Sequence, residues 1–290
     1  MKTITKLILM LFIITPSFAQ AKLDISGTVE WDTMQIKAAV SFDLASEGIK
    51  LPSGRTQAES ILNTGYINLI LSGILDLQVD SSSTIKDLID RGELSLFDAQ
   101  ALALNAKSVS PALSPDMKSM YSFYTITISG VSAALLKHSR PTEIARTLLP
   151  VSTAQYTGII IIASQSLPVY GMRSTAQPIP CLFPKIWDSE MNLIYERSML
   201  ESRNNSMVRY LPAAGIFRNN PSGLSPELQE FVGERPLRIF ARGVFGINPT
   251  DLIIDREDAM LIISSEENRR LLSKGKVAII LDDSVLRRDF

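Results

Sequence analysis

The densest group of side chains that could perform chemistry is acidic, and it consists of Asp255, Glu257 and Asp258. Carboxylates this close in sequence could bind calcium, or could act as the general acid and base of an exported hydrolase. The segment lacks the glycine and the alternating oxygen ligands of a calcium loop. It also coincides with an expected helix start, where negative charge is stabilised by the helix dipole. We therefore favour helix capping and keep the three residues as the alternative catalytic set.

The chain has one histidine, His138, and one cysteine, Cys181. Zinc sites built from several of these residues are therefore excluded. His138 lies in a polar segment before Pro141, which is typical of a solvated loop rather than a catalytic triad. Cys181 has no partner for an intramolecular disulfide, so we expect a buried thiol, with an intermolecular bridge as the alternative.

The sequence carries none of the common motifs for cofactor binding or catalysis. It contains no G-x-S-x-G, Walker, G-x-G-x-x-G or H-E-x-x-H pattern. We therefore expect no cofactor and no metal site, and we favour a non-enzymatic function while leaving the enzymatic one open.

Residues 1–21 have the pattern of a secretory signal peptide. Lys2 and Lys6 precede an apolar run over residues 7–15, and small residues then allow cleavage before Gln20 or Lys22. The run is shorter than the roughly 20 residues that span a bilayer, so no membrane span is expected in the mature chain. The predicted location is the periplasm.

The charge balance excludes a strong electrostatic partner. Lys and Arg number 29 against 30 Asp and Glu, so nothing favours nucleic acid or an anionic membrane surface. Roughly 270 residues remain after the signal, enough for one large domain or two small ones.

Hydrophobic periodicity predicts an α+β fold with mixed, mostly antiparallel sheets, packed helices and two lobes. In the first lobe we expect a hairpin over residues 23–44, a long helix over 56–77 and a short helix over 95–107. A capped turn at Thr84 with Asp87 three residues later resembles a capping box. A Ser/Pro-rich linker over 108–115 places the lobe boundaries at 22–107 and 108–290.

The second lobe should alternate strands and short helices. The four consecutive isoleucines at residues 159–162 predict a central strand buried on both faces. The other expected elements are strands at 121–129, 237–247, 251–254 and 276–281, a hairpin at 185–196, a helical turn at 142–149, and helices capped by Asp255 and by Ser264 with Glu267.

Three stretches of the chain carry a family resemblance: residues 51–59 leading into 80–82, residues 156–161 leading to 184–188, and residues 248–254 followed by 257–259. They resemble uncharacterised exported proteins of spirochaete-type bacteria and, more distantly, small envelope lipoproteins and flagellar outer-membrane accessory proteins. The lipoproteins carry a lipobox cysteine that this chain lacks. The resemblance implies an envelope location and transfers no functional residue.

Export, the missing catalytic constellation and the resemblance together predict a non-enzymatic periplasmic envelope or motility accessory protein. Its expected partner is an envelope or flagellar protein or the cell wall. The alternatives are an exported hydrolase that uses the acidic residues above and a periplasmic module that binds a small ligand in an apolar cavity.

Overall fold

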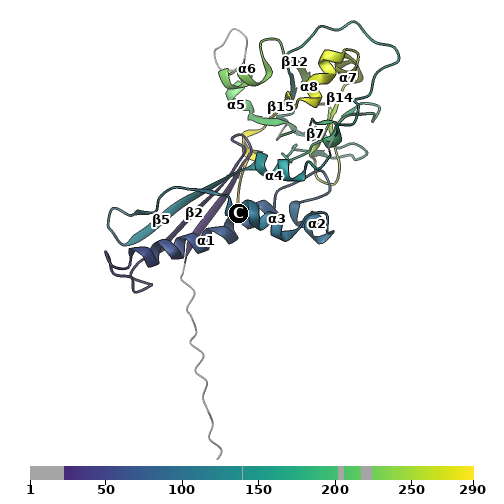
Figure 1. Cartoon of the computed structure of the whole chain (residues 1–290). Coiled ribbons are helices and arrows are strands. Elements are labelled where there is room, and N and C mark those ends of the chain that lie inside the picture. The colour runs from purple at the N-terminus through teal and green to yellow at the C-terminus, as the bar shows by residue number, and fades with distance from the viewer. Residues whose placement is uncertain (1–22, 139, 202–205, 217–223) are drawn as a thin grey trace, which may run out of the picture.

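The computed structural model describes residues 23–138, 140–201, 206–216 and 224–290. The predicted signal peptide at 1–21 lies outside these residues. Within the described chain, no helix combines the length and the apolarity that crossing a membrane requires. The fold is α+β with two lobes, as the sequence predicted (Figure 1).

An antiparallel sheet forms the N-terminal lobe, with strand order β16-β1-β2-β5-β3 and β4 also paired to β5. The expected hairpin is confirmed, and it pairs Asp24 with Ser41 at one end and Glu30 with Gln35 at the turn. Alternate residues of β2 are buried, as a half-covered strand requires. The strands are β1 (Asp24–Glu30), β2 (Gln35–Asp43), β3 (Lys107–Ser108), β4 (Ala112–Leu113), β5 (Ser119–Thr127) and β16 (Arg287–Asp289).

Helix α1 (Arg55–Leu75) runs along one face of this sheet (Figure 1). It buries Leu62, Ile70 and Ile74 against the strands. Thr84 and Asp87 form the reciprocal capping box that begins α2, as predicted, with Thr84 N–H donating to Asp87 Oδ2 at 2.7 Å. The lobe's smaller helices are α2 (Ile85–Asp90), α3 (Leu96–Leu104) and α4 (Ile128–Leu135).

Strand β16 comes from the far end of the sequence and pairs antiparallel with β1. Ion pairs of two successive arginines hold β16 in place. Arg287 lies 3.2 Å from the buried Glu30, and the Arg288 guanidinium lies 3.6 Å from Asp76 after α1. The C-terminal strand is therefore an integral part of the N-terminal lobe.

The C-terminal lobe contains a parallel sheet with strand order β11-β15-β6-β12. Strand β6 is interior, as its isoleucine run predicted. Ile159 and Ile161 face the main core, whereas Ile160 faces a second cluster that is covered by Leu228 and Val232 of α6. Burial on both faces explains why β6 and β15 are continuously apolar. These elements are β6 (Ile159–Ile162), β11 (Arg209–Pro212), β12 (Leu237–Phe240), β15 (Val277–Leu281) and α6 (Pro226–Val232).

A second sheet of this lobe has the order β10-β9-β14-β13, and the expected hairpin at 185–196 forms its β9–β10 pair. Its strands are β9 (Ile186–Asp188), β10 (Leu193–Tyr195), β13 (Gly243–Phe245) and β14 (Asp251–Ile254). The remaining elements are β7 (Leu167–Pro168), β8 (Thr175–Ala176), α5 (Ala213–Ile216), α7 (Arg256–Ile263), α8 (Glu266–Ser273), and short 3-10 turns at Arg197–Met199 and Asp283–Val285.

The two lobes share one continuous core. Trp31 packs edge-on against Tyr210 with ring centroids 5.7 Å apart. The loop before α2 also pairs with the C-terminal lobe, because Asn248 N–H donates to Ser81 O at 2.8 Å. The boundary suggested between residues 107 and 108 falls inside β3, and β5 beyond it pairs along the whole of β2.

Several local predictions were wrong. Residues 142–149 form no helical turn: only Ile144 of this segment is buried, and Leu148 and Leu149 stay exposed, so there is no apolar helix face to stabilise a turn. The expected strand at 237–247 is split, because β12 joins the parallel sheet and β13 the other one. Ser265, one residue later than expected, caps α8 by accepting from Asn268 N–H.

Candidate functional site

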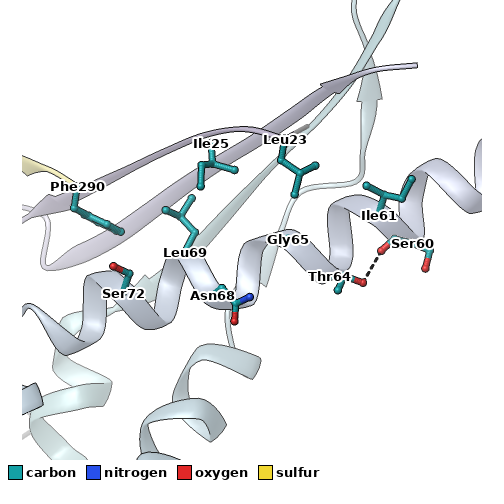
Figure 2. A pocket seen from close by; sticks show the side chains of 10 residues that line it. All are labelled: Leu23, Ile25, Ser60, Ile61, Thr64, Gly65, Asn68, Leu69, Ser72 and Phe290. Carbon is teal, nitrogen blue, oxygen red and sulfur yellow. Dashed lines mark hydrogen bonds between the residues drawn. The ribbon is translucent and has the colours of Figure 1, made fainter. Parts of the chain in front are cut away.

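A long open groove runs between α1 and the outer edge of β1, and we call it the α1–β1 groove (Figure 2). It encloses about 1010 Å³. Leu23 and Ile25 project into it from the strand side, and Ile61 and Leu69 rise towards them from the helix. Its complete lining is Leu23, Ile25, Ser60, Ile61, Thr64, Gly65, Asn68, Leu69, Ser72 and Phe290.

The helix wall consists of two parallel stripes, each with a spacing of four residues. Ile61, Gly65 and Leu69 form the apolar stripe at the floor of the groove. Ser60, Thr64, Asn68 and Ser72 form an exposed polar stripe along the rim. Among the described residues, no charged side chain lines the groove, so it suits an uncharged, largely apolar ligand.

Glycines determine how deep the groove is. A Cβ at Gly65 would overlap Leu23, and a Cβ at Gly27 or at Gly73 would lie under 3.0 Å from the ring of Phe290. Because Gly27 and Gly73 lack side chains, the Phe290 ring fits between β1 and α1. We call the pair Gly27 and Gly73 the glycine notch. Phe290 fills one end of the groove, and Ile25, 51% exposed, lies at the open part.

The three acidic residues predicted as an alternative catalytic set lie together at the start of α7, in the other lobe. Asp255 occupies the N-cap position, but its carboxylate accepts no hydrogen bond from the helix backbone. It instead accepts from Arg242 Nε at 2.7 Å. Glu257 is exposed, and Asp258 is half-buried.

Several pKa values are shifted around this cluster, among them those of Asp258 and Arg242. Burial, followed by the charges of Asp255 and Glu257, raises the pKa of the Asp258 carboxyl. The hydrogen bond and charge of Asp255 raise the pKa of Arg242 further above its usual value. The Asp255 carboxylate is therefore held in an ion pair with Arg242, and Asp258 is the carboxyl of the cluster whose pKa is raised.

Neither His138 nor Cys181 lines the groove. His138 is half-buried, and its Nε2–H donates to Leu200 O at 2.6 Å. Cys181 is buried, as predicted. Burial raises the pKa of its thiol well above the usual value, followed by the effect of the Asp251 charge. A thiol in this environment stays protonated and is a poor nucleophile.

Among the residues that the structure describes, no group of three or more His, Cys, Asp or Glu side chains is arranged to hold a metal ion. Asp251, whose pKa is raised by burial, accepts a hydrogen bond from the Lys185 backbone N–H at 3.2 Å. It fixes the connection between β14 and β9 and faces no open site.

Two segments of the chain, one in each lobe, match family models of domains of the same known protein. Residues 22–134 match the family model described as the N-terminal domain of Treponema pallidum Tp0624. Residues 158–283 match the model described as the second domain of that protein. The chain is similar to two domains of a spirochaete protein. No curated protein matches it. The spirochaete part of the resemblance is thereby confirmed, whereas the likeness to envelope lipoproteins and flagellar proteins stays a hypothesis.

The first match covers both α1 and β1, the two walls of the groove, whereas Phe290 lies outside both matched segments. Sequence reasoning did not identify the groove. Gly65 and Gly73 on the expected helix over 56–77 are the local feature that could have indicated close packing on a sheet, but nothing local in the sequence indicated that Phe290 returns to the same place.

Proposed function

We propose that this protein is an exported, periplasmic accessory protein of the cell envelope that works by binding another protein. The observation that carries the proposal is the α1–β1 groove, with its apolar floor and its uncharged polar rim. Contiguous exposed apolar surface on a folded protein marks an interaction site. The signal-like pattern of residues 1–21 supports the location.

The composition of the groove favours a protein over the cell wall as partner. Glycan strands present many hydroxyl groups, and burying these against Ile61, Leu69 and Ile25 would leave them without hydrogen-bond partners, at a cost of about 1–3 kcal/mol each. Apolar side chains of a polypeptide fit the same floor without that cost. The polar rim can accept or donate to the backbone of such a segment.

Photo-crosslinking at the groove tests the proposal. We would place p-benzoylphenylalanine at Asn68 on the rim and, as a matched control, at Gln100, an exposed amide residue of α3 outside the groove. We expect one or a few defined crosslinked proteins in intact cells from the Asn68 position only. The unlabelled variant Asn68→Trp should compete poorly for the same partner, whereas Gln100→Trp should compete like the native chain.

Equal crosslinking from both positions, or none from either, would refute a binding role for the groove. A partner captured only from Gln100 would move the interface to another surface of the lobe.

A further inference from the structure

Resting on the proposed function, we propose that the partner binds as an extended polypeptide strand. The strand adds to the outer edge of β1, antiparallel to it, and continues the line of β16 beyond Phe290. It places apolar side chains at alternate positions into the α1–β1 groove.

Backbone hydrogen bonds define the open edge. Phe290 N–H donates to Gly27 O at 3.0 Å, and Trp31 N–H donates to Leu286 O at 2.9 Å. In an antiparallel strand every second residue turns its N–H and C=O to the same side. Ile25 therefore turns its backbone groups to the side that Gly27 and Trp31 use. Within the described chain, β16 pairs with β1 only at Thr28–Glu30.

Phe290 shows how a residue paired to the edge of β1 places its side chain in the groove. After β16, Phe290 continues the pairing to Gly27 and inserts its side chain between β1 and α1. A strand that continued in the same direction would face Ile25 two residues further on. Side chains of directly paired residues share one face of a sheet, so the residue opposite Ile25 would point into the groove as Phe290 does.

The length of the groove fixes the length of the segment. From Ile61 to Ser72 the helix rises about 16 Å, which corresponds to about five residues of strand at roughly 3.3 Å each. Two or three of their side chains would face α1. Since the groove lining that the structure describes contains no charged side chain, these should be apolar.

An open backbone edge distinguishes a polypeptide from other apolar occupants. A fatty acyl chain could fill the apolar floor but would leave the N–H and C=O of Ile25 without a partner. A strand satisfies both, and this is how extended peptides recognise exposed sheet edges generally.

A phage-displayed random decapeptide library panned against the mature chain tests the inference. We expect selected peptides with apolar residues at alternate positions. On binding, hydrogen exchange of the Ile25 amide should slow. Methylating the peptide backbone nitrogen that faces β1 should weaken binding about tenfold, the equivalent of one lost hydrogen bond.

Two variants at one position separate backbone from side-chain recognition. Ile25→Pro removes the outward N–H while keeping an extended backbone, and it should weaken binding about tenfold. Ile25→Ala keeps the N–H and should weaken binding less. Asn68→Trp should block the groove, and Phe240→Ala, which removes an exposed aromatic of β12, should change nothing.

The outcomes distinguish failure of the inference from failure of the proposed function. If Asn68→Trp abolishes binding but Ile25→Pro binds normally and the Ile25 amide stays unprotected, the groove binds proteins and strand addition is wrong. A dimer that Ile25→Pro dissociates, or a co-purifying fatty acid that Asn68→Trp removes, would assign the groove to another occupant and overturn the inference. If no peptide is selected and crosslinking at Asn68 also fails, both proposals fall.

Discussion

Replacing Gly73 by alanine should destabilise the protein only while Phe290 is present. Gly73 lies in the last turn of α1 and forms the helix side of the glycine notch. A Cβ there would overlap the tip of the Phe290 ring. Gly27 on the opposite side leaves no space either, since its own Cβ position is 2.5 Å from the ring. To make room for the Cβ, the ring would have to shift along the groove and lose its place in the glycine notch.

The magnitude follows from two opposing effects. Overpacking a well-filled site costs about 1–3 kcal/mol, whereas alanine in place of glycine stabilises a helix by about 0.5–1 kcal/mol. Gly73→Ala alone should therefore lower the free energy of unfolding by about 1 kcal/mol. In the background of Phe290→Ala the overlap is gone, so the same change should raise it by about 0.5–1 kcal/mol. The sign reverses between the two backgrounds.

A double-mutant cycle measures this coupling. Urea unfolding of the native chain, both single variants and the double variant can be followed by fluorescence of the buried Trp31, which lies in the core that the lobes share. We expect a coupling energy of about 2 kcal/mol between positions 73 and 290. Additive effects within about 0.5 kcal/mol would refute the notch. So would stabilisation by Gly73→Ala in the native background.

Three further predictions concern buried polar groups that hold the fold together. Burial opposes ionisation of Glu30, but hydrogen bonds from Lys37 and Thr33 prevail and lower its pKa below the usual 4.5. Its contribution is thus present above pH 4.5 and lost as pH falls through the lowered pKa, so Glu30→Gln should cost about 1–2 kcal/mol in urea unfolding at pH 7 and progressively less as the pH falls below 4.5. Asn268→Asp should cost at least about 3 kcal/mol by thermal or urea unfolding, because a carboxylate would replace the buried amide whose Nδ2 donates to two backbone carbonyls. Tyr210→Phe should cost about 1–2 kcal/mol in the same assay, since the Tyr210 hydroxyl accepts from the backbone N–H of Cys181 and donates to its backbone carbonyl. An unchanged unfolding midpoint in the Asn268 or the Tyr210 variant would refute the structural role of that residue.

Local patterns predicted the elements whose signal is contained in a few neighbouring residues. The Thr84 capping box needs only the side chain three positions later, and the isoleucines of β6 announce burial on both faces by their continuity. Burial alternates along residues 237–242, with the even-numbered residues exposed. The division of that segment between two sheets was not predictable, because it depends on partners distant in sequence.

The candidate site was the least predictable part. The acidic residues formed a candidate site because they are close together in sequence. In the structure, however, Asp255 forms an ion pair with Arg242 from another segment. The α1–β1 groove contains no residue type that signals chemistry. It arises where helix α1 and strand β1 meet Phe290, which follows both elements by more than 200 residues in the chain. Apolar patterning shows that a face is covered, and it does not show by what.

The sequence by itself determined the export-like N-terminus, the α+β class, the hairpin β1–β2, the long helix and the central strand of isoleucines. These follow from periodicity, capping and turn chemistry, which act over a few residues. Only the tertiary structure decided that β16 returns to β1, that Phe290 enters the glycine notch, and that no strand of the described chain pairs with β1 at Ile25 on the side of β16. Such features depend on pairing between distant segments, and a strand's own residues do not specify which edge it joins.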